Sequence, residues 1–381
     1  MARIILGSYM VRYPLGGMMS WVLQWILGFR RLGHEIYFVE KSNYSNACFD
    51  PVKSVMSDDC SYGIKTVSAL FRHFGLPNRW CFVDSEGRYH GIPRSELESI
   101  FQSADIFIDM GTHGSWSEEA EKAGKRILVD GEPGYTQMKM KKTLDIGGSL
   151  PEYDYYYSNG HNIGTSRSSA PTAGRSWRPV FNPVVIDLYP FIPVDNNAPF
   201  TTVMNWQSHE PIQFRGHTYG QKDVEFNKFL NLPLLTDTPM EIAVAGKHTP
   251  KNRLIDFGWR VRDAIDITLS FQSFREYIQR SIGEFSVCKN VFVETQSGWF
   301  SDRSAAYLAS GRPVVLQETG FSIHLPCGNG LFAVETANDA RDAIAEIITN
   351  YKRHSFWARE LASEYLEAGT VLRRFLSELG I

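Results

Sequence analysis

The sequence predicts an α/β protein of two domains, each built on a mainly parallel sheet. Short apolar runs alternate with amphipathic stretches along the whole chain, as they do in strand–helix–strand units. The pattern begins a second time after a proline-rich stretch at 190–199. With 381 residues, the chain also exceeds the size at which a single hydrophobic core usually stops growing.

The first half opens with a strand, a glycine turn, a helix and a second strand. Residues 3–7 are a β-rich run, and apolar residues recur at three- and four-residue steps over 18–32, which is the period of one helix face. Further strands are predicted at 35–39, 105–109, 126–129 and 153–157, with helices at 95–104 and 117–123. This succession favours parallel strands joined by right-handed crossovers.

A long loop and a linker separate the two halves. Residues 159–178 are rich in Gly, Ser, Thr and Ala, and long loops of this kind are often functional. The second half then repeats the architecture, with strands at 201–204, 240–245 and 313–316 and helices at 271–282, 304–310, 338–348 and 356–379, the last broken near Gly369. We therefore predict an N-terminal domain over 1–190, a linker over 191–200, a second domain over 201–355 and a C-terminal helix over 356–381.

Composition excludes several classes of protein. A formal charge of -3 and a pI near 6.4 argue against a nucleic-acid partner. The five cysteines include no CxxC pair, so no metal site is expected, and their wide spacing fits reduced thiols in the cytoplasm. The longest apolar stretch, 18–29, is interrupted by Gln24 and is too short for a transmembrane segment.

The most informative stretch is 297–321, SGWFSDRSAAYLASGRPVVLQETGF. A glycine loop leads into a helix start, where free backbone N–H groups can bind a phosphate. Ser301 and Ser304 add hydroxyl donors, and Arg303 adds a cation suited to a diphosphate. Asp302 is also a favoured N-cap residue, so an ordinary helix cap is the alternative interpretation. A second glycine turn follows the strand, where open α/β sheets bind ligands.

This stretch resembles the donor-binding core of GT-B glycosyltransferases, in which a glycine loop, a helix, a Gly-x-Pro-Val-Val strand and a further turn follow one another. The strand signature here is GRPVV at 311–315. The resemblance implies two Rossmann-like domains facing each other across a cleft, with the C-terminal helix crossing back. It also implies a nucleotide-diphosphate sugar as co-substrate, with no other cofactor. The donor-binding residues it suggests in this stretch are Gly298, Trp299, Ser301, Asp302, Arg303, Ser304, Glu318, Thr319 and Gly320.

The sequence departs from the family pattern at two points. The paired glutamates of many retaining members would fall near Gly298 and Ala306, and neither is present. The histidine that opens the loop in many inverting members is also missing, so the stereochemical course stays open. Lys222 resembles the lysine that some members place on the donor phosphates, with Arg215 as its partner. A solvated surface pair is an equal alternative for these two residues.

The N-terminal half contains three candidates for the general base. His113 directly follows a predicted strand, and its ordinary pKa near neutrality suits proton transfer. Asp130 and Glu132, at the end of the next strand, compete for the same role. Gly16 and Gly17 allow a substrate to approach the backbone, but any tight strand-to-helix turn needs such glycines too.

Three functions fit these observations. The first is transfer of a hexosyl or deoxyhexosyl group to a hydroxyl acceptor, such as a polysaccharide, a lipid-linked sugar or a small natural product. The second is a nucleotide-sugar epimerase of the same fold, which would need no acceptor. The third is a non-catalytic binding protein of GT-B type, an alternative that the missing glutamates keep open.

Overall fold

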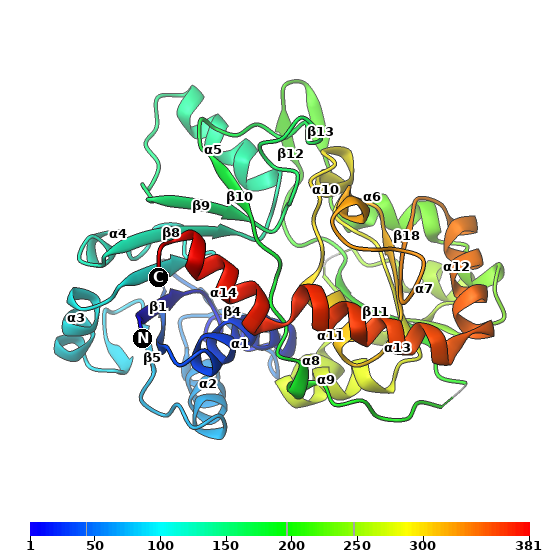
Figure 1. The fold of residues 1–381 in the computed structure, drawn as a ribbon, viewed down its shortest axis with the longest axis horizontal. Coiled ribbons are helices and arrows are strands. Elements are labelled where there is room, and N and C mark those ends of the chain that lie inside the picture. The colour runs from blue at the N-terminus through cyan, green and yellow to red at the C-terminus, as the bar shows by residue number, and fades with distance from the viewer. Residues whose placement is uncertain (43, 196, 247) are drawn as a thin grey trace.

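The computed structural model describes residues 1–42, 44–195, 197–246 and 248–381, and it contains two α/β domains side by side (Figure 1). The N-terminal domain has an eight-stranded sheet of order β10-β9-β8-β7-β1-β2-β5-β6, in which every pair is parallel except β5–β6. Its strands are β1 (Arg3–Gly7), β2 (Glu35–Lys41), β5 (Trp80–Val83), β6 (Tyr89–Gly91), β7 (Ile106–Asp109), β8 (Lys125–Asp130), β9 (Tyr155–Ser158) and β10 (Trp177–Pro179). Its helices are α1 (Gly16–Arg31), α2 (Ser61–His73), α3 (Arg94–Gln102), α4 (Ser117–Ala120) and α5 (Tyr135–Asp145), and a small hairpin is formed by β3 (Cys48–Asp50) and β4 (Val55–Ser57).

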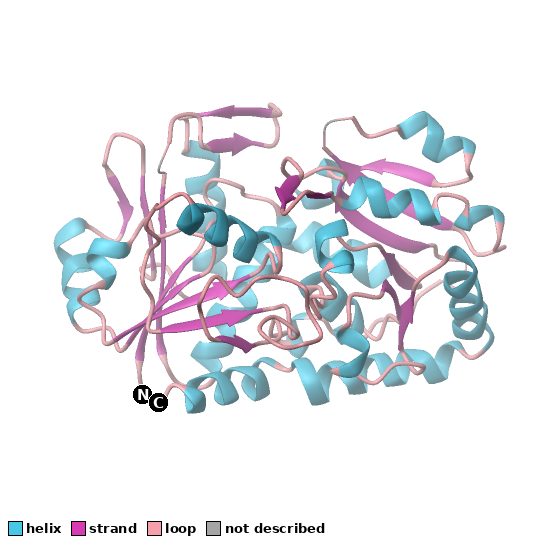
Figure 2. Ribbon diagram, turned by 90° about the horizontal axis from the view of Figure 1, so that it is seen from above, coloured by secondary structure: helices cyan, strands magenta, loops and turns pink. Residues whose placement is uncertain are grey.

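The C-terminal domain has a six-stranded, fully parallel sheet of order β15-β14-β11-β16-β17-β18. Its strands are β11 (Phe200–Asn205), β14 (Met240–Ala245), β15 (Arg260–Asp263), β16 (Gly283–Ser286), β17 (Val314–Gln317) and β18 (Leu331–Val334). Its helices are α6 (Lys222–Phe226), α7 (Lys251–Asp256), α8 (Ile265–Thr268), α9 (Phe271–Arg280), α10 (Asn290–Glu294), α11 (Asp302–Ala309) and α12 (Ala337–Thr349). A hairpin is formed by β12 (Ile212–Phe214) and β13 (His217–Tyr219). Short 3-10 turns occur at Ile186–Leu188, Asn227–Phe229, Leu232–Leu234 and Phe321–Ile323. Figure 2 shows helices on both faces of the two sheets.

Apolar periodicity explains why these segments pack as they do. Strand β1 is buried along Ile4, Ile5 and Leu6, as expected for a parallel strand covered on both faces. Helix α1 buries Val22, Trp25 and Phe29 at the predicted spacing. The predicted fold class is therefore confirmed for both halves.

The end of the chain crosses back to the N-terminal domain as a broken helical stretch, as predicted. It consists of α13 (Tyr351–Leu361), a π-helical turn (Ala362–Leu366) and α14 (Ala368–Glu378). The break lies at Glu367, whose ψ of 132° leaves the helical region, two residues before Gly369. At this point the chain pairs with the other interdomain crossing, since the Val184 N–H donates to Leu366 O at 2.8 Å. Asn196, within the predicted linker, lies outside the described residues.

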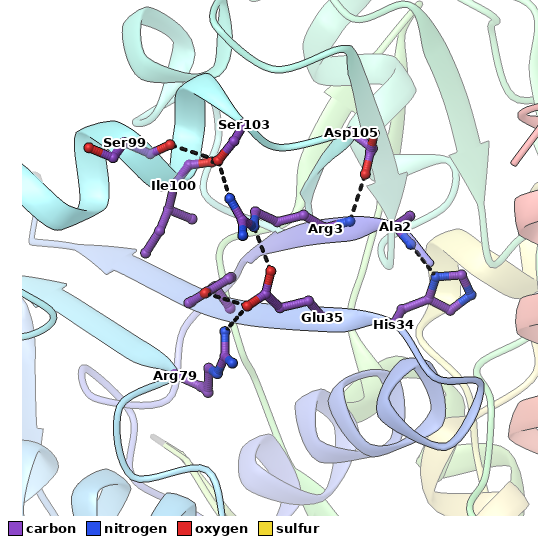
Figure 3. A network of polar contacts seen from close by, with 10 residues as sticks. Ala2, Arg3, His34, Glu35, Arg79, Ser99, Ile100, Ser103 and Asp105 are labelled. Carbon is purple, nitrogen blue, oxygen red and sulfur yellow. Dashed lines mark hydrogen bonds and ion pairs between the residues drawn. The ribbon is translucent and has the colours of Figure 1, made fainter.

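Polar contacts at the amino ends of the N-terminal strands are complete within the protein (Figure 3). Glu35 accepts hydrogen bonds from Arg3 at 2.6 Å and from Arg79 at 2.5 Å. Although burial opposes ionisation, these two guanidinium groups lower the pKa of Glu35 to about 2. The backbone N–H of Arg3 donates to Asp105 at 2.7 Å, so this end of the sheet needs no external ligand.

Candidate functional site

Lys222 is the most unusual charged residue of the C-terminal domain. It begins α6 and is 8% exposed. The part of the chain that the structure describes contains no ion pair or hydrogen bond of its ammonium group. Burial and the neighbouring charge of Arg303 lower the pKa of Lys222 to about 7. A buried cation without a counter-ion is costly, so an anion at this position would stabilise it.

Arg303 lies beside Lys222 and is bound to its own domain. Its Nε donates to Glu284 Oε1 at 2.6 Å, and a terminal nitrogen donates to Ser286 Oγ at 2.6 Å. A second terminal nitrogen donates to the carbonyl of Val203 at 2.5 Å. The Arg303 guanidinium, which was predicted to bind a diphosphate, is therefore held by its own domain near the carboxyl ends of β11 and β16. Its positive charge still acts on Lys222.

An ion pair joins the two domains near these cations. Lys289 follows β16, and its Nζ lies 2.6 and 2.7 Å from the two carboxylate oxygens of Glu132, which follows β8 in the N-terminal domain. His209 Nε2 lies 3.4 Å from Lys289 Nζ and 3.7 Å from the Glu132 carboxylate. The His209 ring also stacks on Tyr135, with 4.0 Å between ring centroids. The interdomain contact thus has an ionic part and an aromatic part.

The start of α11 is capped by its own residues. The N-cap is Ser301, whose Oγ accepts from the Arg303 N–H at 3.2 Å, while Asp302 is the first helical residue. This use of the Arg303 amide corrects the expectation that it is free for an anion. Burial raises the pKa of Asp302. Among the described residues, the hydroxyls of Ser304 and Ser297 are buried without a hydrogen-bond partner.

The two predicted glycine turns lie against each other. The Gly298 N–H donates to Thr319 O at 2.6 Å, and Thr319 Oγ1 donates to Trp299 O at 2.7 Å. Glu318 accepts from the N–H groups of Thr319 and Gly320. Folding therefore brings together two turns whose contacting residues Trp299 and Thr319 are 20 positions apart in the sequence.

The 159–178 segment of the N-terminal domain packs against these turns. The Asn162 N–H donates to Ser297 O at 2.9 Å, and its side chain donates to Gln296 O at 2.9 Å. A Cβ on Gly320, where φ is 90°, would lie 2.4 Å from Asn162 Nδ2. Trp299 forms a β-bridge to Gly160 and packs on Phe292 with 4.8 Å between ring centroids. The loop is thus an interdomain contact, and Trp299 is part of it.

His113 is presented by a turn that Asp109 organises. Asp109, fully buried at the end of β7, accepts from the N–H groups of Thr112 at 2.7 Å and Gly114 at 3.0 Å and from Tyr153 OH at 2.6 Å. His113 itself has a φ of 53° and an exposed side chain. Although the side chain is exposed, partial desolvation by the neighbouring residues lowers its pKa, so the neutral imidazole can accept a proton.

The other two base candidates are engaged elsewhere. Asp130 is buried and accepts from Gln137 Nε2 at 2.8 Å and from Ser158 Oγ at 2.9 Å. Although burial opposes ionisation of Glu132, the charge of Lys289 and hydrogen bonds from His209 and Lys289 lower its pKa to about 2. Of the three candidates, only His113 has no hydrogen bond to the described residues.

The remaining predicted residues lie at the domain interface or on the surface. A Cβ on Gly16 would lie 2.4 Å from Ser270 O, so Gly16 lets α1 approach α9 closely, whereas Gly17 has only Phe274 nearby, at 3.9 Å. Arg215 lies at the exposed turn of the β12–β13 hairpin with a φ of 51°, over the ring of Phe214. The exposure of Arg215 and the burial of Lys222 differ from the matched pair that was predicted.

A possible metal-binding group lies away from all predicted residues. Cys60, Asp84 and His90 bring ligand atoms within 4.8 Å of one another, and no other such group occurs in the described ranges. However, one Asp84 oxygen already accepts from Arg88 at 2.8 Å and contacts His90 at 2.9 Å. The guanidinium occupies the place that a cation would need.

Sequence reasoning missed Lys289, His209 and Asn162, which all join the two domains. None belongs to a recognisable motif, and each becomes significant only through a partner that is more than 70 residues away. Lys289 alone had a usable signal, because it lies three residues after the end of the parallel strand at 283–286.

Comparisons with known proteins give a result only at the level of structure. No family model and no curated protein matches the sequence. An alpha-glucosyltransferase solved with UDP and a 13-mer DNA matches at a TM-score of 0.60 and 11% identity, over 100% of both chains. The Anabaena protein HepE, solved with UDP-glucose, matches at a TM-score of 0.60 and 10% identity, also over 100% of both chains. The chain therefore has the two-domain GT-B fold of these glycosyltransferases.

Proposed function

We propose that this protein is a glycosyltransferase that moves a hexosyl or deoxyhexosyl group from a nucleoside-diphosphate sugar to a hydroxyl group. The observation that carries the proposal is the cationic cluster at the carboxyl ends of β11 and β16. Arg303 and Lys289 lie close enough to lower the pKa of Lys222, which is buried without a counter-ion among the described residues. A diphosphate supplies the charge that this cluster lacks.

The location of the cluster supports the same proposal. Open α/β sheets bind ligands beyond the carboxyl ends of their strands, and the two GT-B structures similar to this chain hold UDP or UDP-glucose. The buried, unpartnered hydroxyls of Ser297 and Ser304 are further donors for an anionic ligand.

In the proposed reaction, His113 removes the proton from the acceptor hydroxyl. The oxygen then bonds to the anomeric carbon while the bond from that carbon to the phosphate oxygen breaks. Lys222 and Arg303 stabilise the departing diphosphate, which needs no metal in this scheme. Glu318, Thr319 and Gly320 contribute the second turn on the donor side.

The acceptor is proposed to be a hydroxyl-bearing molecule other than a nucleic acid. The net charge of -3 supports this, because nucleic-acid binding usually needs a basic face. A cytoplasmic location is also proposed, supported by five cysteines without disulfides, four of them buried. Among the described helices, none is long and apolar enough to cross a membrane.

Isothermal titration with UDP, GDP and ADP tests the proposal directly. We expect one of them to bind with a Kd in the roughly micromolar to millimolar range. Incubation of the matching nucleotide-sugars with sugar acceptors, and separately with duplex DNA, should release the nucleoside diphosphate only with the sugars. Failure of all three nucleotides to bind would contradict the proposal, and isomerisation of a donor without an acceptor would favour an epimerase.

A further inference from the structure

The ion pair between Glu132 and Lys289 has a feature that a purely structural salt bridge does not need. Lys289 is 9% exposed and belongs to the same cationic cluster as Lys222 and Arg303. Glu132 reaches it from the opposite domain, and 42% of its own side chain is exposed. The carboxylate therefore lies at the domain interface, in contact with one cation of the cluster proposed to bind the donor diphosphate.

The charges around Lys289 indicate the role of Glu132 at the domain interface. Arg303 is neutralised within its own domain by Glu284, which is fully buried. Lys222 and Lys289 have no carboxylate from the C-terminal domain within ion-pair distance among the described residues. Glu132 is thus the negative charge that the N-terminal domain contributes to this cluster, at 2.6 and 2.7 Å from Lys289.

We propose that Glu132 is an internal substitute for the donor phosphate: it holds Lys289 in the free protein, and donor binding transfers Lys289 from Glu132 to the diphosphate. This inference rests on the proposed function. Its physical basis is that one ammonium group close to both anions prefers the phosphate, which carries more charge and more acceptor oxygens.

The exchange makes Glu132 a competitor of the donor. Any interaction that the free protein must give up before it binds a ligand reduces the apparent affinity for that ligand. The ion pair also joins the domains beside the Tyr135–His209 ring contact, so donor binding releases one of the contacts between the domains. Glu132 is accordingly a positioning residue that acts through Lys289.

The test is isothermal titration of UDP, GDP and ADP into the wild type and into Glu132→Gln, Lys289→Met and the double variant. We expect Glu132→Gln to tighten binding of the nucleoside diphosphate about tenfold, and Lys289→Met to weaken it about tenfold. In the double variant, the gain from removing Glu132 should disappear. Glu119→Gln is the matched control, because it breaks a 2.6 Å pair with Lys41 that lies entirely within the N-terminal domain.

The matching nucleoside without phosphates gives a readout that a general loss of structure would not imitate. Its affinity should stay within about twofold in all variants, because the exchange acts on the phosphate alone. Should Glu132→Gln not fold, Glu132→Asp lengthens the pair and should also tighten binding. Weaker or unchanged diphosphate binding in these carboxylate variants would overturn the inference, whereas no nucleotide binding by the wild type would overturn the proposed function instead.

Discussion

The two walls of the interdomain cleft differ in how their charges are compensated. On the N-terminal wall, the buried carboxylates have partners from their own domain: Glu40 accepts from the N–H groups of Met10 and Val11, and Asp109 accepts from Thr112. On the C-terminal wall, Lys222 is buried and left without a counter-ion among the described residues. The buried carboxylates of the first wall are therefore compensated without a ligand, whereas the second wall contains a buried cation that an anion would stabilise.

This difference assigns separate tasks to the two domains. A wall whose carboxylates are held by backbone N–H groups keeps one geometry, which suits the presentation of a catalytic group such as His113. A wall with unpaired positive charge gives up stability in the free protein and regains it when the ligand binds.

Replacing His113 by alanine should lower kcat about 10²–10⁴-fold, because a positioned general base contributes an acceleration of that order. The affinity for the nucleoside diphosphate should stay unchanged, since His113 belongs to the other wall. Steady-state kinetics and titration measure the two quantities. His73→Ala, an exposed change on α2, is the control. A loss below about tenfold would assign the base to another residue.

Arg303→Met should destabilise the protein by about 3–5 kcal/mol, because it leaves the fully buried Glu284 carboxylate without a counter-ion. Urea unfolding followed by fluorescence measures the change. Adding Glu284→Gln should recover most of the loss, since no buried charge then remains. If the single variant is as stable as the wild type, the ion pair with Glu284 does not hold Arg303 in place, and its guanidinium is free to bind the ligand.

Lys222→Met should weaken nucleoside-diphosphate binding about 10–100-fold, the value of one or two charge-assisted hydrogen bonds. It should also raise the Tm of the free protein, because it removes an uncompensated buried cation. Both effects are measured on the same samples by titration and calorimetry. Lys251→Met, which breaks an exposed pair with the exposed Asp263, serves as the control. Unchanged binding together with a lower Tm would contradict the assignment.

The affinity for the diphosphate should fall as the pH rises, by at most about tenfold per pH unit. The phosphate needs the charged ammonium, and the pKa of Lys222 in the free protein is about 7. Titrations from about pH 7.5 to 9.5 avoid the phosphate's own ionisation near pH 6. The stability of the free protein should rise over the same window, because the unfolded chain then binds the proton that folded Lys222 releases. Lys222→Met should abolish both trends.

The local pattern of apolar residues was sufficient to predict the helices and strands in which that pattern has a clear period. The strand at 3–7, the helix that follows it and the strand at 240–245 were predicted closely, because buried parallel strands and amphipathic helices have short-range signatures. Helix α2 and the edge strands β6 and β15 were missed. The two edge strands have few apolar residues and depend on neighbours that are remote in sequence. Helix α2, in contrast, has apolar residues at helical spacing (Ile64, Val67, Leu70 and Phe71), so its signal was present and overlooked.

The candidate site divides in the same way. Lys222, Arg303 and His113 could be chosen from the sequence, because each stands beside a strand end or a helix start. The ion-pair partners of these side chains could not be predicted from the sequence, since Arg303 is held by Glu284 and Lys222 is unpaired only as a result of packing.

Residue order alone thus established two α/β domains and the segments whose ends form the cleft, because hydrophobic periodicity acts over a few neighbouring residues. Only the tertiary structure decides which charged side chains are neutralised and which domain supplies the opposite charge. Glu132 and Lys289 are separated by 157 positions in the chain, and no local rule relates them. The compensation of a charge depends on distance and burial in three dimensions, which a linear pattern does not contain.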